Sequence, residues 1–120
     1  MSHQKALKGL IFKFTAAFSG IITGFKSDRS LQGQYLIALT VIIVFLLINI
    51  SLIEWMILLG CIGLVISLEY VNSSIELLCD HTNGAYDPLI KKVKDFMAAA
   101  VLIASITSAI IGLLILIQNI

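Results

Sequence analysis

The feature that most constrains this chain is a long apolar run that ends in a cluster of acids. Residues 55–68 (WMILLGCIGLVISL) contain no ionisable side chain other than a thiol, and residues 69–80 (EYVNSSIELLCD) then add three carboxylates. If this segment lies in a bilayer, the acids must face protein or water, because an ionisable group exposed to lipid costs several kcal/mol.

Helical geometry gathers these acids on one face. At about 100° per residue, Glu69, Glu76 and Asp80 fall within about 40° of one another on an α-helix. Ser73 lies in the same sector, and Asn72 lies beside it. We call Glu69, Ser73, Glu76 and Asp80 the acid column. Charged groups placed at such a cost indicate a functional site.

The composition indicates a membrane protein. The 120-residue chain is 59% hydrophobic and only 12% charged, whereas a soluble domain carries about 25% charged residues. We therefore predict an all-α membrane protein, and the length leaves room for one domain over residues 1–120.

Four helical segments are predicted within this domain. Residues 4–26 repeat apolar side chains at i, i+3, i+4 and i+7, yet lysines recur through them. This pattern predicts an amphipathic helix in the cytoplasmic membrane interface, not a cleaved signal peptide. The polar residues 27–33 are predicted to form a turn. Three transmembrane helices are predicted at residues 35–53, 55–80 and 89–117.

The basic residues orient the chain. They occur before the first apolar span and between the second and third spans. By the positive-inside rule, the N-terminus and the 81–95 loop lie in the cytoplasm. Three spans cannot enclose a polar column on every side, so we expect further subunits to complete the enclosure.

The residues available for chemistry are mainly carboxylates. The sequence has neither a GxxxxGK[ST] loop nor a Cys/His cluster suited to zinc. Carboxylates suit Mg²⁺ carried by a nucleotide, because this ion prefers oxygen ligands and shares them with substrate phosphates. Lys94 could meet the phosphate charge. Glu69 could take the proton of a lipid hydroxyl, because burial strengthens the hold of a carboxylate on a proton.

Plainer interpretations remain open for several of these residues. Asp80 and Asp87 lie near helix ends, where acids are often ordinary interface residues. Asn72 and Ser73 could be interhelical hydrogen-bonding groups. Lysines 91 and 92 suit topology and headgroup contacts.

The motif E-x-x-N-[ST]-x-I-E-x-x-x-D at residues 69–80, followed by YDPLIKKVKDFMAAAVLIA, resembles the prokaryotic diacylglycerol kinase and undecaprenol kinase family. The resemblance extends over essentially the whole chain. It implies a homotrimeric membrane enzyme of the bacterial cell (inner) membrane that passes the γ-phosphoryl group of MgATP to a lipid hydroxyl.

The resemblance also implies roles for individual residues. Glu69 corresponds to the catalytic base and, with Asn72, to a substrate contact. Asp28 and Glu76 correspond to the metal ligands. The implied ATP-binding residues are Asp28, Glu76, Asp80, Tyr86, Asp87, Lys94 and Asp95. The chain departs from the family pattern at Asp28, where Glu is usual, and at Asp87, where many members carry His.

The SLIEWM turn at residues 51–56 and the sequence as a whole resemble the Gram-positive-type members of the family more than the Gram-negative diacylglycerol enzymes, and this resemblance implies undecaprenol as the lipid. A small proton-coupled multidrug transporter is a more distant alternative, although such proteins usually need an acid in the first span, and this chain has none there. A non-catalytic assembly protein is a third possibility. Transfer of γ-phosphate from ATP to lipid distinguishes these functions.

Overall fold

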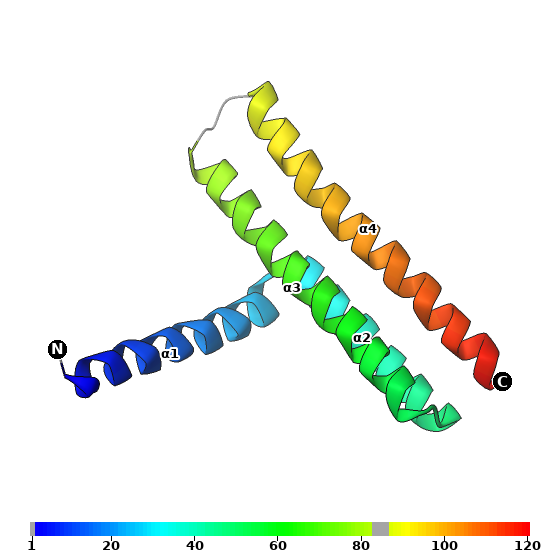
Figure 1. Cartoon of the computed structure of the whole chain (residues 1–120). Helices are drawn as coiled ribbons and strands as arrows, with labels where there is room; N and C mark the ends of the chain where they lie inside the picture. The colour runs from blue at the N-terminus through cyan, green and yellow to red at the C-terminus, as the bar shows by residue number, and fades with distance from the viewer. Residues whose placement is uncertain (1, 83–86) are drawn as a thin grey trace.

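The computed structural model describes residues 2–82 and 87–120, which form four α-helices (Figure 1). They are α1 (His3–Ser27), α2 (Arg29–Ile48), α3 (Leu52–Thr82) and α4 (Pro88–Asn119). The described residues contain no β-strand, so the predicted all-α fold is confirmed. Helix α1 points away from the other three helices, which run alongside one another (Figure 1).

A single residue, Asp28, separates α1 from α2. Its backbone is extended (φ −106°, ψ 116°), and its N–H donates to the carbonyl of Gly24 (3.0 Å). Its carboxylate accepts a hydrogen bond from the N–H of Leu31 (3.0 Å). The predicted turn over residues 27–33 is therefore wrong for residues 29–33, because an aspartate N-cap allows the polar residues after it to begin a helix.

The turn between α2 and α3 is tight. Asn49 takes a left-handed conformation (φ 72°), which asparagine tolerates better than most residues. The N–H of Ser51 donates to Oε1 of Glu54 (3.0 Å), and the N–H of Glu54 donates to Oγ of Ser51 (3.2 Å). This capping box starts α3 at Leu52, so residues 52 and 53 belong to α3 and not to the preceding helix.

The end of α2, the start of α3 and the end of α4 are packed together. A buried apolar cluster joins them and consists of Phe45, Ile50, Leu58 and Ile115. Beside it, Nδ2 of Asn119 donates to Oε2 of Glu54 (2.9 Å), which ties the end of α4 to the start of α3.

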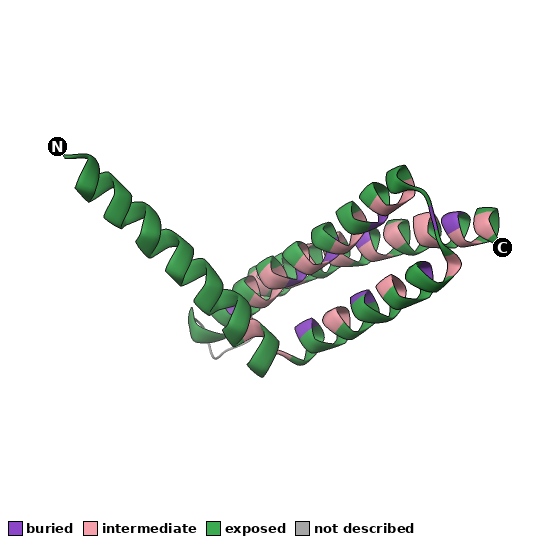
Figure 2. Ribbon diagram, turned by 90° about the horizontal axis from the view of Figure 1, so that it is seen from below, coloured by how far each residue is buried: buried purple, intermediate pink, exposed green. Residues whose placement is uncertain are grey.

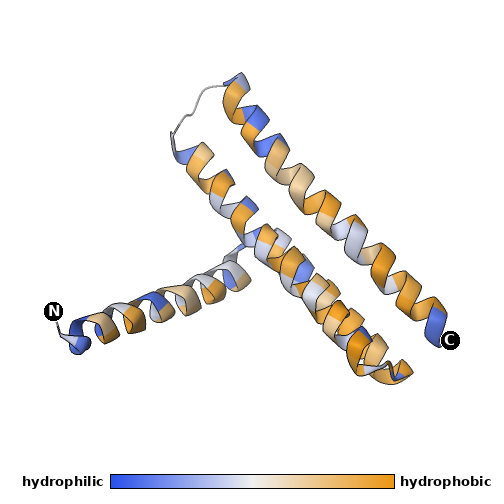
Figure 3. Cartoon of the chain, viewed as in Figure 1, coloured by the Kyte–Doolittle hydropathy of each residue, from blue (hydrophilic) through white to orange (hydrophobic). Residues whose placement is uncertain are grey.

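Most large apolar side chains face outward (Figure 2). Leu47 is 82% exposed and Leu52 is 76% exposed, for example. By length and composition, all four helices are able to cross a membrane. Hydrophobic residues make up most of the length of α2, α3 and α4 (Figure 3). A chain with such surfaces requires lipid as its solvent, and it is a membrane protein.

Helix α3 is much longer than α2. With 31 residues against 20, it exceeds α2 by about 16 Å at about 1.5 Å per residue. The end of α3 and the start of α4 therefore extend past the α1–α2 corner (Figure 1). Hydrophilic residues gather on these extensions (Figure 3), which also carry several of the predicted site residues.

Candidate functional site

The acid column lies on α3, which is helical without interruption from Leu52 to Thr82. Glu69 is buried, with 5% of its surface exposed, and Ser73 is half-buried. Glu76 and Asp80 are exposed. The column therefore passes from a protected carboxylate to two carboxylates that are open to solvent.

Asp28, at the α1–α2 corner, reaches this column. The Ser73 hydroxyl lies close to its carboxylate and is the main cause that lowers the pKa of Asp28 below its ordinary value. Partial burial opposes the shift, while backbone N–H groups in the first turn of α2 support it. Ser73 lies one helical turn from both Glu69 and Glu76, so a fourth carboxylate, that of Asp28, joins the three of the column from another element.

Asn72 lies beside the column and is half-buried. Its Oδ1 atom is enclosed and accepts no hydrogen bond from the residues that the structure describes. An enclosed acceptor without a donor costs free energy, so such atoms call for a partner. A hydroxyl or N–H group of a bound molecule suits this position, in line with the predicted substrate contact.

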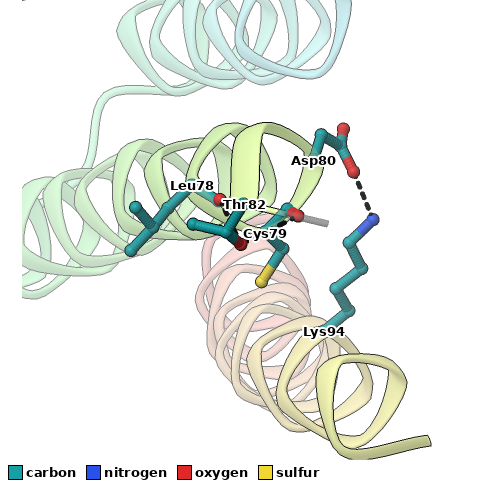
Figure 4. Close-up of polar contacts among 5 residues, drawn as sticks. All are labelled: Leu78, Cys79, Asp80, Thr82 and Lys94. Carbon is teal, nitrogen blue, oxygen red and sulfur yellow. Dashed lines mark hydrogen bonds and ion pairs between the residues drawn. The ribbon is translucent and has the colours of Figure 1, made fainter. Parts of the chain in front are cut away.

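The predicted nucleotide contacts on α4 are engaged in ion pairs. Nζ of Lys94 lies 2.6 Å from Oδ1 of Asp80 (Figure 4), and Nζ of Lys91 lies 2.6 Å from Oδ2 of Asp95. The Lys94 side chain is 37% exposed and that of Asp80 is 67% exposed. Exposed pairs of this kind contribute little stability. Lys94 can therefore exchange Asp80 for a phosphate group at little cost.

Next to this ion pair, the side chain of Thr82 caps the C-terminal end of α3. Oγ1 of Thr82 donates to the carbonyls of Leu78 (3.0 Å) and Cys79 (3.2 Å) (Figure 4). These bonds satisfy carbonyls that a helix end would otherwise leave open. They give the backbone around Asp80 a fixed position.

Two predicted site residues belong to the α3–α4 connection. Asp87 is the N-cap of α4, because its carboxylate accepts from the N–H of Leu89 (2.9 Å) and Pro88 follows it at the first helical position. This capping is a structural role, which the sequence alone leaves open for Asp87. Tyr86 lies outside the described residues.

The donor atoms fit magnesium by chemical type. No group of three His, Cys, Asp or Glu side chains within residues 2–82 and 87–120 lies close enough to hold a metal ion. A site built on Asp28 and Glu76 alone is compatible with Mg²⁺, which commonly takes one or two carboxylates, keeps waters and shares substrate phosphates.

A cavity of about 510 Å³ lies between α2, α3 and α4. Its lining is almost entirely apolar and includes Val41, Cys61, Ile66 and Gly112. None of the predicted site residues that the structure describes lines it. The cavity is therefore separate from the acid column.

Two side chains at the α1–α2 corner were not predicted. Nε2 of Gln32 donates to the carbonyls of Phe25 and Lys26 (3.1 Å each), which caps the end of α1. Oη of Tyr70, on α3, donates to the carbonyl of Ile21 on α1 (2.8 Å). These contacts join residues on different helices, and no sequence pattern signals them.

The chain is similar in sequence to known proteins over most of its length. The profile of the family described as prokaryotic diacylglycerol kinase matches residues 15–116. The chain is 37% identical over 113 residues to the undecaprenol kinase of Bacillus subtilis, covering 94% of this chain and 92% of that protein.

Two further relatives carry another name. The chain is 31% identical over 107 residues to a diacylglycerol kinase of Helicobacter pylori, covering 87% of this chain and 84% of that protein. It is 32% identical over 104 residues to a diacylglycerol kinase of Synechocystis, covering 86% of this chain and 59% of that protein.

Proposed function

The chain belongs to the prokaryotic diacylglycerol kinase family and is a lipid kinase, and from this membership we propose that it phosphorylates undecaprenol with ATP at the cytoplasmic face of a bacterial cell membrane. The observation that carries the proposal is that the carboxylate of Asp28 lies beside Ser73 of the acid column. This placement brings a carboxylate from the α1–α2 corner to the acid column, where a lipid headgroup and a nucleotide can meet.

Glu69 is the catalytic base in this proposal. The lipid hydroxyl oxygen attacks the γ-phosphorus of ATP, the bond from that phosphorus to the β–γ bridging oxygen breaks, and ADP leaves. The hydroxyl proton passes to the carboxylate of Glu69, which burial suits to accept it. Asn72, which lies beside Glu69 on α3, orients the hydroxyl by donating from its Nδ2–H to the hydroxyl oxygen.

The nucleotide is held by the exposed end of the site. Asp28 and Glu76 would hold Mg²⁺, which supplies neutralisation of phosphate charge when bound. Lys94 leaves Asp80 and contacts the phosphates, and Asp95 and the residues around Asp87 complete the contacts. Tyr86 is proposed for the same role from the family resemblance alone. Positioning and charge neutralisation account for most of the catalysis in such transfers.

The assembly proposed is a homotrimer. The three spans of a single chain leave part of the acid column exposed, and neighbouring copies would complete its enclosure. Helix α1 lies in the cytoplasmic interface as an amphipathic helix, since lysines recur along it. The N-terminus and the residues that follow α3 face the cytoplasm.

Diacylglycerol is the alternative substrate, because two of the similar proteins are named for it. Purified protein in mixed micelles with γ-labelled ATP and either lipid separates the two. Faster labelling of undecaprenol supports the proposal, and equal or faster labelling of diacylglycerol overturns the choice of lipid. A transporter or an assembly protein labels neither lipid.

The matched variants are Glu69→Gln and Glu54→Gln, which make the same change on α3 at opposite ends of the bundle. Glu69→Gln should abolish labelling without dissociating the oligomer, because an amide cannot accept the proton. Glu54→Gln should keep the wild-type rate. Near wild-type turnover by Glu69→Gln shows that another group is the base.

A further inference from the structure

The hydroxyl of Tyr70 joins three helices. From α3 it donates to the carbonyl of Ile21 on α1 (2.8 Å), and the hydroxyl oxygen of Tyr35 on α2 lies 2.8 Å from it. Because Tyr70 directs its hydrogen to Ile21, Tyr35 is the donor in the second bond. We call this chain of two hydrogen bonds, from Tyr35 through Tyr70 to Ile21, the tyrosine link.

The ring of Tyr70 occupies the space that a side chain at position 24 of α1 would need. A Cβ atom placed on Gly24 would lie 2.4 Å from Cε1 of Tyr70 and 2.8 Å from Cδ1 of Leu31. Glycine is therefore required for this close approach. Leu31 is only 1% exposed, so the ring is seated on one of the most enclosed points of the fold.

The residues under this ring also hold Asp28. The carbonyl of Gly24 accepts from the N–H of Asp28 (3.0 Å), and the N–H of Leu31 donates to Oδ1 of Asp28 (3.0 Å). On α3, Ser73 follows Tyr70 by one turn and lies close to the same carboxylate. The position of Tyr70 therefore sets where Asp28 stands relative to the acid column.

We infer that Tyr70 is a positioning residue, which holds the α1–α2 corner against α3 through the tyrosine link and its contact with Gly24, and so places Asp28 for the nucleotide's magnesium. Tyr70 itself does not contact the substrates. The inference rests on the metal-binding role given to Asp28 in the proposed function.

Kinetics of the full-length protein in mixed micelles test the inference. Tyr70→Phe keeps the ring and removes both hydroxyl contacts. We expect the KM for MgATP to rise about tenfold, which is about 1.4 kcal/mol, while kcat and the KM for the lipid change by less than about twofold. Tyr35→Phe removes only one bond and should have a smaller effect. Ser67→Ala, one turn before Tyr70 on α3 and exposed, should behave as wild type.

A double-mutant cycle tests whether Tyr70 acts through Asp28. In an Asp28→Asn background, Tyr70→Phe should add less than about twofold to the KM for MgATP, because the two changes remove one shared interaction. Independent effects that multiply would overturn the inference. If Tyr70→Phe does not fold, Tyr35→Phe takes its place in the cycle.

Hydrogen exchange separates this inference from the proposed function. Peptides covering residues 20–31 should exchange faster in Tyr70→Phe than in wild type, and Ser67→Ala should leave them unchanged. A wild-type protein that labels no lipid refutes the proposed function, and exchange still tests the link. Wild-type exchange together with a wild-type KM for MgATP in Tyr70→Phe overturns the inference.

Discussion

Replacing Gly24 by alanine tests the corner between α1, α2 and α3 directly. The new methyl group would lie 2.4 Å from Cε1 of Tyr70, a rigid ring that two hydrogen bonds hold in place. It would also lie 2.8 Å from Leu31, which is almost fully buried. Neither neighbour can move aside freely.

Two effects set how much Gly24→Ala changes the free energy of unfolding. Overpacking of this kind costs about 1–3 kcal/mol, whereas Gly→Ala within a helix gains up to about 1 kcal/mol. We expect Gly24→Ala to lower the free energy of unfolding by about 1–2 kcal/mol. A methyl group added to Gly20, also on α1, would meet nothing within 4 Å, so Gly20→Ala should raise the free energy of unfolding by about 0.5–1 kcal/mol.

The assay is reversible unfolding of the purified protein in mixed detergent micelles, followed by circular dichroism. The two variants make the same chemical change on the same helix, so the opposite signs isolate the contact with Tyr70. If Gly24→Ala is as stable as Gly20→Ala, the Tyr70 ring does not pack against Gly24, and the argument built on that contact is refuted.

Three further predictions concern the ends of the bundle. Lys94→Ala should raise the KM for MgATP at least about tenfold in steady-state labelling. Asp80→Asn, which releases Lys94 from its ion pair, should change the thermal midpoint little. A large loss of stability in Asp80→Asn would contradict the small contribution expected of this exposed pair. The lowered pKa of Asp28 stabilises the fold fully above the ordinary carboxyl pKa, and this contribution is lost as pH falls through the folded-state pKa. Unfolding free energy measured against pH should therefore fall less steeply on acidification in Asp28→Asn, which keeps a capping side chain, and identical profiles would show that Asp28 is not the group responsible. Asn119→Ala removes the hydrogen bond to Glu54 (2.9 Å) and should lower the free energy of unfolding without changing the KM for MgATP. A changed KM would show that the contact between the end of α4 and the start of α3 influences the site.

Much of the fold could be predicted because apolar length and lysine placement are local properties. The helices after the first follow from apolar runs, and the tight turn near Asn49 follows from its turn-forming residues. The start of α2 is where the prediction fails, because the polar residues 27–33 suit a turn as well as a helix start. The aspartate that caps a helix and the aspartate that begins a turn look the same in sequence.

The site, like the fold, combines features that the sequence predicts with features that depend on how the helices pack. The acid column could be predicted because Glu69, Ser73 and Glu76 share a helical face whatever the tertiary structure. The approach of Asp28 to Ser73 could not, since it depends on how the α1–α2 corner meets α3. Only the family resemblance points to Asp28 in the sequence, and Tyr70 carries no signal at all. Contacts between helices are set by packing, which a single sequence does not display.

The unequal lengths of α2 and α3 have a consequence for how two immiscible reactants meet. A bilayer matched to α2 leaves the last turns of α3 and the first turns of α4 standing in water. On the proposed function, an alcohol dissolved in the membrane and a triphosphate dissolved in the cytosol can then react at the phase boundary. Neither compound has to leave its own solvent.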